Sequence, residues 1–344
     1  MNARRGGFVL VATLWLLVAL AAVGLDASLR SRTRRLAAAN RIDEVRAQAA
    51  ALAGTEYARS RLTAAMLDRA DELRAEALDR ARTDRARRRT ASRSVRNLFR
   101  SADPLEDPWR APDELVVPDM AFGDARFTLR VRDTGAALNL NEAGEDVLRN
   151  FFAQGMGLDY AAADELAQAI LDWRDEDELP RVNGGERAEY IDMNAPVLPP
   201  NRDFAELDEL RHVLGMTPEL YDAALPYVTL TGSGNVNVNA APAPVLLALP
   251  GMTPAAVRQL LELRESGVFA RNLRELRDIV PLAMASGDAG EEDEERFNRI
   301  TTFTTNEVEI LSDGRVDGSP IRVRARVVVA RSNTGAVVVW RKLE

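Results

Sequence analysis

Residues 8–25 read FVLVATLWLLVALAAVGL, and these 18 residues contain no charged side chain. A helix rises about 1.5 Å per residue, so this stretch spans ~27 Å, close to the thickness of the hydrocarbon core of a bilayer. Arginines flank it on both sides, at Arg4 and Arg5 before it and at Arg30, Arg32, Arg34 and Arg35 after it. The sequence therefore predicts a transmembrane helix. The first pair favours an N-terminus inside the cell, whereas the second group weakens an orientation based on charge alone.

The alternative for this segment is a cleaved signal peptide, which also has a basic start and an apolar stretch. The apolar stretch is longer than a typical signal core, however, and no small-x-small cleavage site precedes a folded domain. Apolar residues instead recur at mostly three-, four- and seven-residue steps as far as Met66, and the first proline is Pro104. This spacing predicts one continuous helix, apolar to Leu25 and amphipathic beyond it, about 90 Å long.

The composition excludes several kinds of chemistry. The chain has 344 residues, 45 basic and 53 acidic side chains, a net charge of −8 and no cysteine. Without cysteine there is no disulfide framework, thiolate metal site or cysteine nucleophile. The only histidine, His212, cannot form a His-pair zinc site, and its helical context predicts a structural role. Catalytic motifs of the G-x-S-x-G, Walker A and H-E-x-x-H types are absent, so we predict that the protein is not an enzyme.

The charge is distributed unevenly along the chain. Residues 1–100 carry a net charge of +11 and residues 101–344 a net charge of −19, so the two parts should face different surroundings. The segment 68–100 is rich in arginine and aspartate. It could form a basic patch for nucleic acid or anionic lipid, but it lacks the interleaved aromatic residues that stack on bases. A solvated linker near the membrane is the favoured interpretation.

The middle of the chain contains two pairs of similar segments. LNLN at 138–141 and VNVN at 236–239 each predict a short strand followed by a helical stretch, and GMTP at 215–218 recurs at 251–254. In the GMTP pair, threonine suits a helix N-cap and proline the first helical position. These patterns predict a set of short helices within 140–285 and suggest an internal duplication.

The segment 236–276 resembles the helix-hairpin-helix modules of DNA-binding proteins. Such hairpins need two glycines so that backbone amides can approach phosphate. Gly251 is present, but Thr253 occupies the second glycine position, and the surrounding region is acidic. We therefore expect the hairpin to serve packing. A membrane-anchored DNA receptor remains the alternative function.

An acidic stretch lies between the two repeats. Residues 171–194 read LDWRDEDELPRVNGGERAEYIDMN. Calcium takes six to eight oxygen ligands, several of them from one loop, although the spacing here is not that of an EF-hand. A loop as long as 174–204 also needs some interaction that fixes its conformation. A structural calcium site is one hypothesis and an ordinary solvated acidic loop is the other. The candidate ligands are Asp172, Asp175, Asp177, Asn183, Glu186 and Asp192.

Alternating residues predict β-strands on both sides of this region. Phe127, Leu129 and Val131 alternate with polar residues, which indicates a half-buried strand. Similar patterns predict strands at 303–311, 321–330 and 337–340, the last two joined by a turn at 333–335. These strands can form one sheet that packs on the amphipathic helix.

The N-terminus resembles those of type IV pilins and pseudopilins. The resemblance rests on a short basic leader ending in Gly7, followed by Phe8 and an apolar helix that becomes amphipathic. It implies that a membrane peptidase cuts between Gly7 and Phe8 and methylates the new N-terminus. Most members carry a glutamate at the fifth mature position, where this chain has Ala12. That departure implies a subunit at the end of a filament, with no neighbour ahead of it to pair with.

Four further segments are similar to the type II secretion system minor pseudopilin K family: 133–141, 171–190, 207–230 and 235–252. The resemblance implies an α+β fold, in which a type IV pilin-like N-terminal helix packs on an antiparallel sheet and a large all-α domain is inserted between strands. It places the calcium ligands best at Asp175, Asp177 and Glu186, with the other three as further candidates. Some members brace this region with a disulfide, which this chain cannot form.

The resemblance also implies a location, a function and partners. The protein would cross the bacterial inner membrane once, with its head in the periplasm. It would help to initiate a pseudopilus and limit its elongation from the tip. Partners would be other minor pseudopilins and the prepilin peptidase, with secreted substrate and the outer-membrane secretin as further contacts and no nucleic acid. The implied division is 1–7 leader, 8–25 transmembrane stem, 26–67 amphipathic stem, 68–112 linker, 113–137 β part, 138–299 inserted domain and 300–344 β part.

Overall fold

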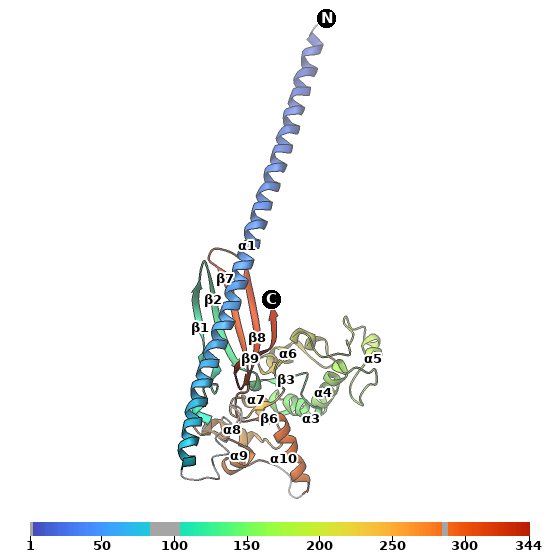
Figure 1. The fold of residues 1–344 in the computed structure, drawn as a ribbon. Coiled ribbons are helices and arrows are strands. Elements are labelled where there is room, and N and C mark those ends of the chain that lie inside the picture. Colours follow the sequence, from blue (N-terminus) through green and yellow to red (C-terminus); the bar gives the residue numbers. More distant parts are fainter. Residues whose placement is uncertain (1–2, 83–103, 284–287) are drawn as a thin grey trace.

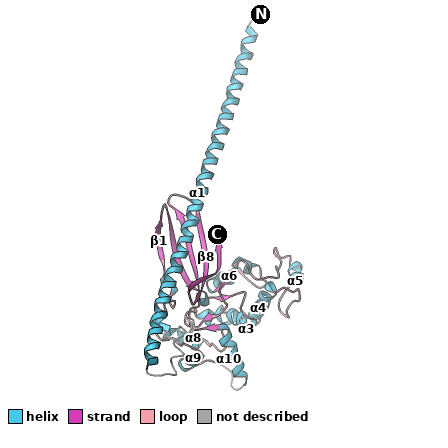
Figure 2. Ribbon diagram, viewed as in Figure 1, coloured by secondary structure: helices cyan, strands magenta, loops and turns pink. Residues whose placement is uncertain are grey.

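The computed structural model describes residues 3–82, 104–283 and 288–344. A long N-terminal helix lies against a five-stranded antiparallel sheet, and a domain of short helices is inserted between the second and third strands of that sheet (Figure 1). Figure 2 shows the long strands gathered on one side of the helix and short helices around the distal end of the molecule. The predicted α+β, pilin-like architecture is confirmed.

Helix α1 (Ala3–Arg82) is 80 residues long. Its N-terminal half projects beyond the sheet, whereas its C-terminal half packs along it (Figure 1). Within the described residues it is the one helix long and apolar enough to cross a membrane, and its apolar window is not buried. The face toward the sheet carries mostly small side chains, and those fully buried include Ala47, Ala50, Ala51 and Ala58.

The stem helix ends later than the predicted boundary at 67. It continues to Arg82, so the first part of the predicted 68–112 linker is helical, and the remaining arginine-rich residues 83–100 lie outside the described residues. Ala70 is still buried in the core of the sheet side. Pairs one turn apart, such as Arg69 with Glu72 at 2.9 Å, support the extension. The charged residues of the predicted linker between Asp68 and Glu76 therefore lie on a helix.

The sheet has the strand order β1-β2-β7-β8-β9 with antiparallel pairing throughout. The predicted alternation is confirmed, because Phe127, Leu129 and Val131 are buried against α1. The strand predicted from 303 begins only at Glu307, since residues 303–306 connect the inserted domain to the sheet. The bounds are β1 (Val117–Phe122), β2 (Ala125–Asp133), β7 (Glu307–Val316), β8 (Arg322–Ser332) and β9 (Gly335–Leu343).

The inserted domain runs from β3 to β6. Its elements are β3 (Leu138–Asn139), α3 (Glu145–Asn150), η5 (Phe151–Gly155), α4 (Tyr160–Arg174), α5 (Arg187–Asp192), η6 (Leu207–His212), α6 (Pro218–Ala224), η7 (Leu225–Tyr227), β4 (Val228–Thr229), β5 (Val236–Asn237), α7 (Ala243–Leu246), α8 (Pro254–Glu265), α9 (Leu273–Ile279), α10 (Asp288–Ile300) and β6 (Thr301–Thr302). Thr217 and Thr253 cap α6 and α8 as predicted, each with proline in the first turn. Short 3-10 helices η2 (Pro104–Glu106), η3 (Pro112–Glu114) and η4 (Thr134–Ala136) lie outside this domain.

The inserted domain is not entirely helical, which corrects the predicted all-α domain ending at 299. Strand β3 pairs in parallel with β4, and β5 pairs in parallel with β6. The short strands predicted at 138–141 and 236–239 are confirmed as β3 and β5. Their partners β4 and β6 were not predicted, because a strand of two residues shows no alternation of apolar and polar side chains. Strand β6 also moves the end of the domain to Thr302.

The suggested duplication appears as a repeated set of hydrogen bonds. Arg174 at the end of α4 donates to the carbonyls of Leu140 and Ala143. Arg264 at the end of α8 donates to the carbonyls of Val238 and Ala241, so the second unit repeats the arrangement of the first. The units differ mainly in the connection after this arginine-bearing helix. The first unit carries the long acidic segment 175–203, whereas the second turns within 266–269.

A buried ion pair connects the stem, the sheet and the inserted domain. The guanidinium of Arg331 on β8 lies 2.7 Å from Asp107 and donates to the carbonyl of Thr305 at 2.9 Å. It also lies over the ring of Trp109, whose indole N–H donates to the carbonyl of Leu62 on α1. Because the ion pair is almost fully buried, it holds these elements in one arrangement.

Asp133 connects the end of β2 to the second unit of the duplication. Its carboxylate accepts hydrogen bonds from the side chains of Asn237 at 2.7 Å and Thr305 at 2.8 Å, and from the backbone N–H of Gly135 at 2.9 Å. Burial raises the pKa of Asp133 even though these three donors favour its charged form. The end of β2 is thereby fixed to the start of the second unit.

Helix α1 and β7 approach each other so closely that only glycine fits at one position. A Cβ atom on Gly314 would lie 1.9 Å from the carbonyl oxygen of Ala47, which is backbone and cannot move aside.

We predict that Gly314→Ala lowers the free energy of unfolding by about 2–3 kcal/mol or more, because helix and sheet must separate. Thermal unfolding of the detergent-solubilised chain measures this. Gly144→Ala is the matched control, since its nearest neighbour is the flexible Asp146 side chain at 3.3 Å. Equal melting temperatures for the two variants would contradict the prediction.

Candidate functional site

The acidic segment 175–203 forms a loop on the side of the inserted domain away from α1, where Figure 1 shows α5. Both ends of the loop are held by aromatic packing on Trp173, the last buried residue of α4. The Trp173 ring stacks on Phe204 with centroids 6.1 Å apart and contacts Tyr190 at 5.7 Å. Burial raises the pKa of Tyr190, and its hydroxyl accepts a hydrogen bond from the Leu214 backbone N–H. The loop therefore starts and ends at fixed points.

Three of the six predicted ligands come together. One carboxylate oxygen from each of Asp175, Asp177 and Glu186 lies within 4.8 Å of the other two. Asp175 is partly exposed, Asp177 is exposed and Glu186 is buried, so the cluster opens to solvent on one side. These are the residues that the family resemblance placed best.

The other three predicted ligands have different surroundings. Asp172 is fully buried and accepts from Arg181, from its backbone N–H at 3.1 Å and its guanidinium at 2.6 Å. Asn183 is turned toward Asp164 and Gln168. Asp192 is exposed at the end of α5 and lies outside the cluster. Arg181 also contacts Asp175, at 2.5 Å, so it connects Asp172 to the cluster.

Asn201 is a residue of this site that the sequence did not point to. Its side-chain amide donates to the carbonyl of Asp177 and, at 3.3 Å, to a carboxylate oxygen of Glu186. Asn201 follows two prolines and adopts a positive φ of 49°. Those features indicate a turn, but nothing in the local sequence relates it to Glu186, fifteen residues earlier.

The cluster contains buried oxygens that lack a donor. Oδ1 of Asp175, Oε1 of Glu186 and Oδ1 of Asn201 are buried and have no hydrogen-bond partner within the described part of the chain. A buried oxygen without a hydrogen-bond donor lowers the stability of the fold. Three such oxygens in one loop indicate a site where a positively charged ligand would supply the missing partner. Carboxylate and amide oxygens are the hard donors that Ca²⁺ prefers. The residues present therefore fit a calcium ion, with water completing its coordination on the open side.

The electrostatics of the cluster also favour a cation. Burial, followed by the nearby charges of Asp172 and Asp175, raises the pKa of Glu186 to about 7. Arg181 is the basic side chain paired with this group, and it contacts Asp172 and Asp175. A bound cation would lower the repulsion that holds Glu186 partly protonated near neutral pH.

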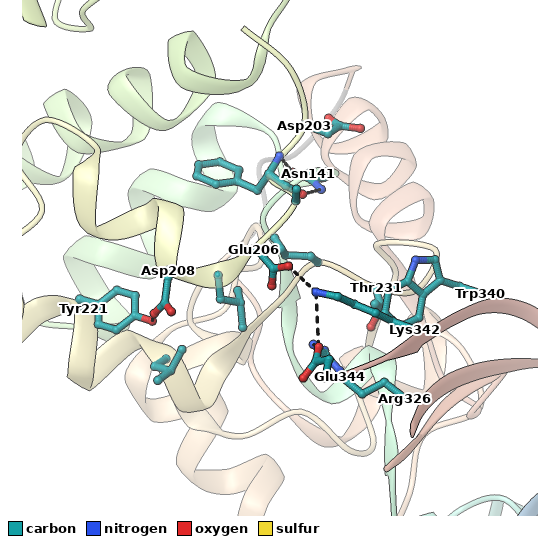
Figure 3. A pocket seen from close by; sticks show the side chains of 15 residues that line it. Asn141, Asp203, Glu206, Asp208, Tyr221, Thr231, Arg326, Trp340, Lys342 and Glu344 are labelled. Carbon is teal, nitrogen blue, oxygen red and sulfur yellow. Dashed lines mark hydrogen bonds and ion pairs between the residues drawn. The ribbon is translucent and has the colours of Figure 1, made fainter. Parts of the chain in front are cut away.

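A second hollow lies where β9 meets the inserted domain (Figure 3). It has a volume of about 630 Å³, and its lining includes Phe204 and Trp340. Several of its charged groups are paired: Lys342 contacts Glu206 and Glu344, while the Tyr221 hydroxyl donates to Asp208 at 2.7 Å. The ion pair between Lys342 and Glu206 joins the last strand to the loop before η6. This hollow therefore lies at the contact between the sheet and the inserted domain.

The α7–α8 hairpin serves packing, as expected from its sequence. Ala248, Leu249 and Met252 around its turn are buried in the core of the inserted domain. The carbonyl of Gly251 accepts a hydrogen bond from the Ala283 backbone N–H at 2.8 Å. The turn that would approach phosphate in a DNA-binding hairpin is thus in contact with the protein itself. Exposed His212 lies at the end of η6, outside both the acidic cluster and the hairpin.

Comparison with known proteins identifies relatives for the inserted domain. Two family models, both described as "Type II secretion system (T2SS), protein K", match residues 129–233 and 236–292. The type II secretion system protein K of Dickeya chrysanthemi is 36% identical over 99 residues, which are 29% of this chain and 25% of that protein. The protein K of Aeromonas hydrophila is 33% identical over 154 residues, 39% of this chain and 45% of that protein. The chain thus spans between a quarter and about half of the length of these curated relatives.

A solved structure shares the fold. A chain in the crystal structure of the GspK-GspI-GspJ complex from the enterotoxigenic Escherichia coli type 2 secretion system matches with a TM-score of 0.53 and 18% sequence identity. The match covers 80% of this chain and 94% of that chain. It therefore includes the helix and sheet as well as the inserted domain. Two family models in sequence order and several curated relatives place residues 129–292 in the type II secretion system protein K family, and the common fold agrees with this.

Proposed function

We propose that this protein is a minor pseudopilin, a structural and non-catalytic subunit at the tip of the type II secretion pseudopilus. The observation that carries this proposal is the combination of a projecting apolar stem helix with a bulky duplicated domain inserted in a pilin-like sheet. Family membership supports it. In the E. coli structure with the same fold, the chains form a complex of three, and we propose corresponding minor pseudopilins as partners here. Neither the comparisons nor the packed α7–α8 hairpin supports the DNA-receptor alternative.

The stem helix supports a single-pass location in the inner membrane with the head in the periplasm. Its apolar residues 8–25 precede the part that packs on the sheet, so the head lies entirely on one side of the proposed membrane segment. Processing by the prepilin peptidase between Gly7 and Phe8 would leave Phe8 as the first residue. Both residues lie within α1, although their side-chain surroundings are outside the described part.

Two features support a position at the tip. The inserted domain lies beside the end of α1 that is farthest from its N-terminus, where a subunit stacked above would need space (Figure 1). Ala12 also lacks the carboxylate that most pilins use to pair with the N-terminus of a neighbour. A subunit with this stem has no need of a neighbour ahead of it, and its head obstructs one. Contacts with secreted substrate or with the secretin would then involve this domain.

We predict that Ala12→Glu reduces the number of assembled pseudopili and the secretion that depends on them. At the tip the new carboxylate finds no amine to pair with, and an unpaired charge in the membrane is costly. Ala12→Val, which stays apolar, is the control and should behave like the wild type. Counting pseudopili by electron microscopy, with the subunit labelled, measures both number and position. Normal assembly of Ala12→Glu together with labels along the shaft would contradict the proposed tip position.

We further propose that the acidic loop binds a structural calcium ion through Asp175, Asp177 and Glu186, with Asn201 beside them. Support comes from the three carboxylate oxygens within 4.8 Å and the three unpaired buried oxygens. The ion would tie residues before and after the turn at 178–185 together. In a chain without cysteine, it would take the part that a disulfide plays in some relatives.

We predict that calcium raises the melting temperature of the head and that Glu186→Gln weakens calcium binding about tenfold or more, because one of three clustered carboxylates is removed. Isothermal titration calorimetry on the detergent-solubilised chain gives the affinity. Asp192→Asn is the matched control, since it removes an acidic group from the same loop but outside the cluster. No heat with calcium, or equal losses in the two variants, would show that the loop is an ordinary solvated one.

The raised pKa of Glu186 predicts a pH dependence in calcium-free buffer. Its folded-state pKa of about 7 lies above the ordinary value of 4.5, so its stabilising contribution is complete below about pH 4.5 and is lost as the pH rises through about 7. Urea unfolding at a series of pH values should show this decrease for the wild type and a shallower one for Glu186→Gln. Calcium should oppose the decrease by binding the charged form. Identical pH profiles for wild type and variant would contradict the assignment.

A further inference from the structure

The part of α1 just beyond the apolar stretch is strongly basic. Residues 26–42 contain one acidic residue, Asp26, and five arginines: Arg30, Arg32, Arg34, Arg35 and Arg41. This contrasts with the head, whose residues 101–344 carry a net charge of −19. Figure 1 shows this part of the helix projecting beyond the sheet, without another element beside it. Its charges are therefore not explained by packing within the chain.

Intramolecular ion pairs account for only part of this charge. Arg30 lies 2.8 Å from Asp26, and Arg41 lies 3.0 Å from Glu44. Arg32, Arg34 and Arg35 are exposed and have no ion pair within the described part of the chain. We call these three residues the arginine collar. Viewed along the helix they point in different directions, since successive residues are about 100° apart.

The position of the collar relative to the apolar stretch matches a membrane surface. Arg32 follows Leu25 by seven residues and Arg35 by ten, or about 10–15 Å along the helix. Side chains on a helix tilt toward its N-terminus, which here is the direction of the membrane. Long arginine side chains can thus reach back by about one turn, 5.4 Å, into the headgroup layer outside the hydrocarbon core.

The shape of this surface also suits a phosphate. Arg34 and Arg35, together with Arg30, line a shallow hollow whose lining also includes the small residues Ser31 and Ala38. Guanidinium groups bind phosphate oxygens in a two-pronged manner. Small residues between the arginines leave space for a headgroup to approach the helix.

In the proposed orientation, these arginines must cross the membrane when the protein is inserted. Short segments exported across the membrane normally avoid arginine close to a transmembrane helix, because translocating it is unfavourable. Here Arg30 and the collar occupy the exported side within ten residues of Leu25. Anionic headgroups of the outer leaflet would offset this by contacting the guanidiniums after insertion.

We propose that the arginine collar binds the headgroup phosphates of anionic phospholipids at the periplasmic surface of the inner membrane. The collar thereby fixes the depth of α1 in the membrane before the subunit joins a filament. Withdrawal of the subunit into a filament breaks these contacts. The inference rests on the proposed membrane anchor and is independent of the role in secretion.

The test uses the full chain reconstituted in vesicles of phosphatidylcholine with spin-labelled phosphatidylglycerol or spin-labelled phosphatidylcholine as the probe. Electron paramagnetic resonance gives the relative association of each labelled lipid with the protein. We expect a several-fold preference for phosphatidylglycerol that falls to near equality in the triple variant Arg32→Gln, Arg34→Gln, Arg35→Gln. High salt should weaken the preference only partly if the phosphate contacts are desolvated, and the triple variant should show no further effect of salt.

The matched control removes three arginines from the head instead, as Arg130→Gln, Arg322→Gln, Arg341→Gln. These residues are exposed on β2, β8 and β9 and change the net charge by the same amount. The control should retain the lipid preference. An unchanged preference in the collar variant, or none in the wild type, would overturn the proposal. So would a collar variant with normal lipid preference but weaker binding to other minor pseudopilins, because the arginines would then pair with carboxylates of a neighbouring subunit.

Insertion is measured separately, by flotation of each protein with vesicles of phosphatidylcholine alone. Wild type and collar variant should both float, because the apolar stretch is unchanged. Failure of the wild type to float would contradict the membrane anchor itself. Flotation without a preference for phosphatidylglycerol would contradict only the collar. The melting temperature of the head, which the collar substitutions do not touch, confirms that the collar variant is folded, and the same measurement on the control variant shows that its exposed substitutions leave the head folded.

Discussion

The ion pair between Arg331 and Asp107 is the interaction on which the arrangement of the head depends. It is almost fully buried, and a charge in such a place is stable only with a close partner. Around it meet the stem helix through Trp109, the sheet through β8 and the segment that leaves the inserted domain through Thr305. Here a large domain interrupts the sheet, and this junction determines where it sits.

The two units of the inserted domain share the same stabilising contacts but have different connections. Each unit is closed by a short parallel strand pair and by an arginine that donates to two carbonyls of the preceding turn. Burial lowers the pKa of Arg264 to about 10, but that arginine stays charged at neutral pH and keeps its donors. The units can therefore differ in the connection after this arginine. In the first unit that connection became the acidic loop, the part of the head best suited to a bound cation.

The net charge of −8 is an average over parts with different tasks. The stem concentrates positive charge next to its apolar stretch, while the head is acidic and its 175–203 loop carries eight carboxylates. Without cysteine, this loop is held by the aromatic stack on Trp173 and by Arg181, which contacts both Asp172 and Asp175. Charge and packing thus take the place that a covalent bridge has in some relatives.

The sequence alone determined the stem helix, the alternation in β2 and the threonine caps, because each depends on residues within one or two turns or along one strand. It also indicated which loop is acidic and which family the chain resembles. Only the tertiary structure decided that Asp175, Asp177 and Glu186 meet while Asp192 does not, that Asn201 joins them, and that Gly314 must be a glycine. It alone decided that β4 and β6 pair with the short strands β3 and β5. The reason is physical: these features depend on the approach of backbone segments far apart in the chain, and no local pattern records that distance.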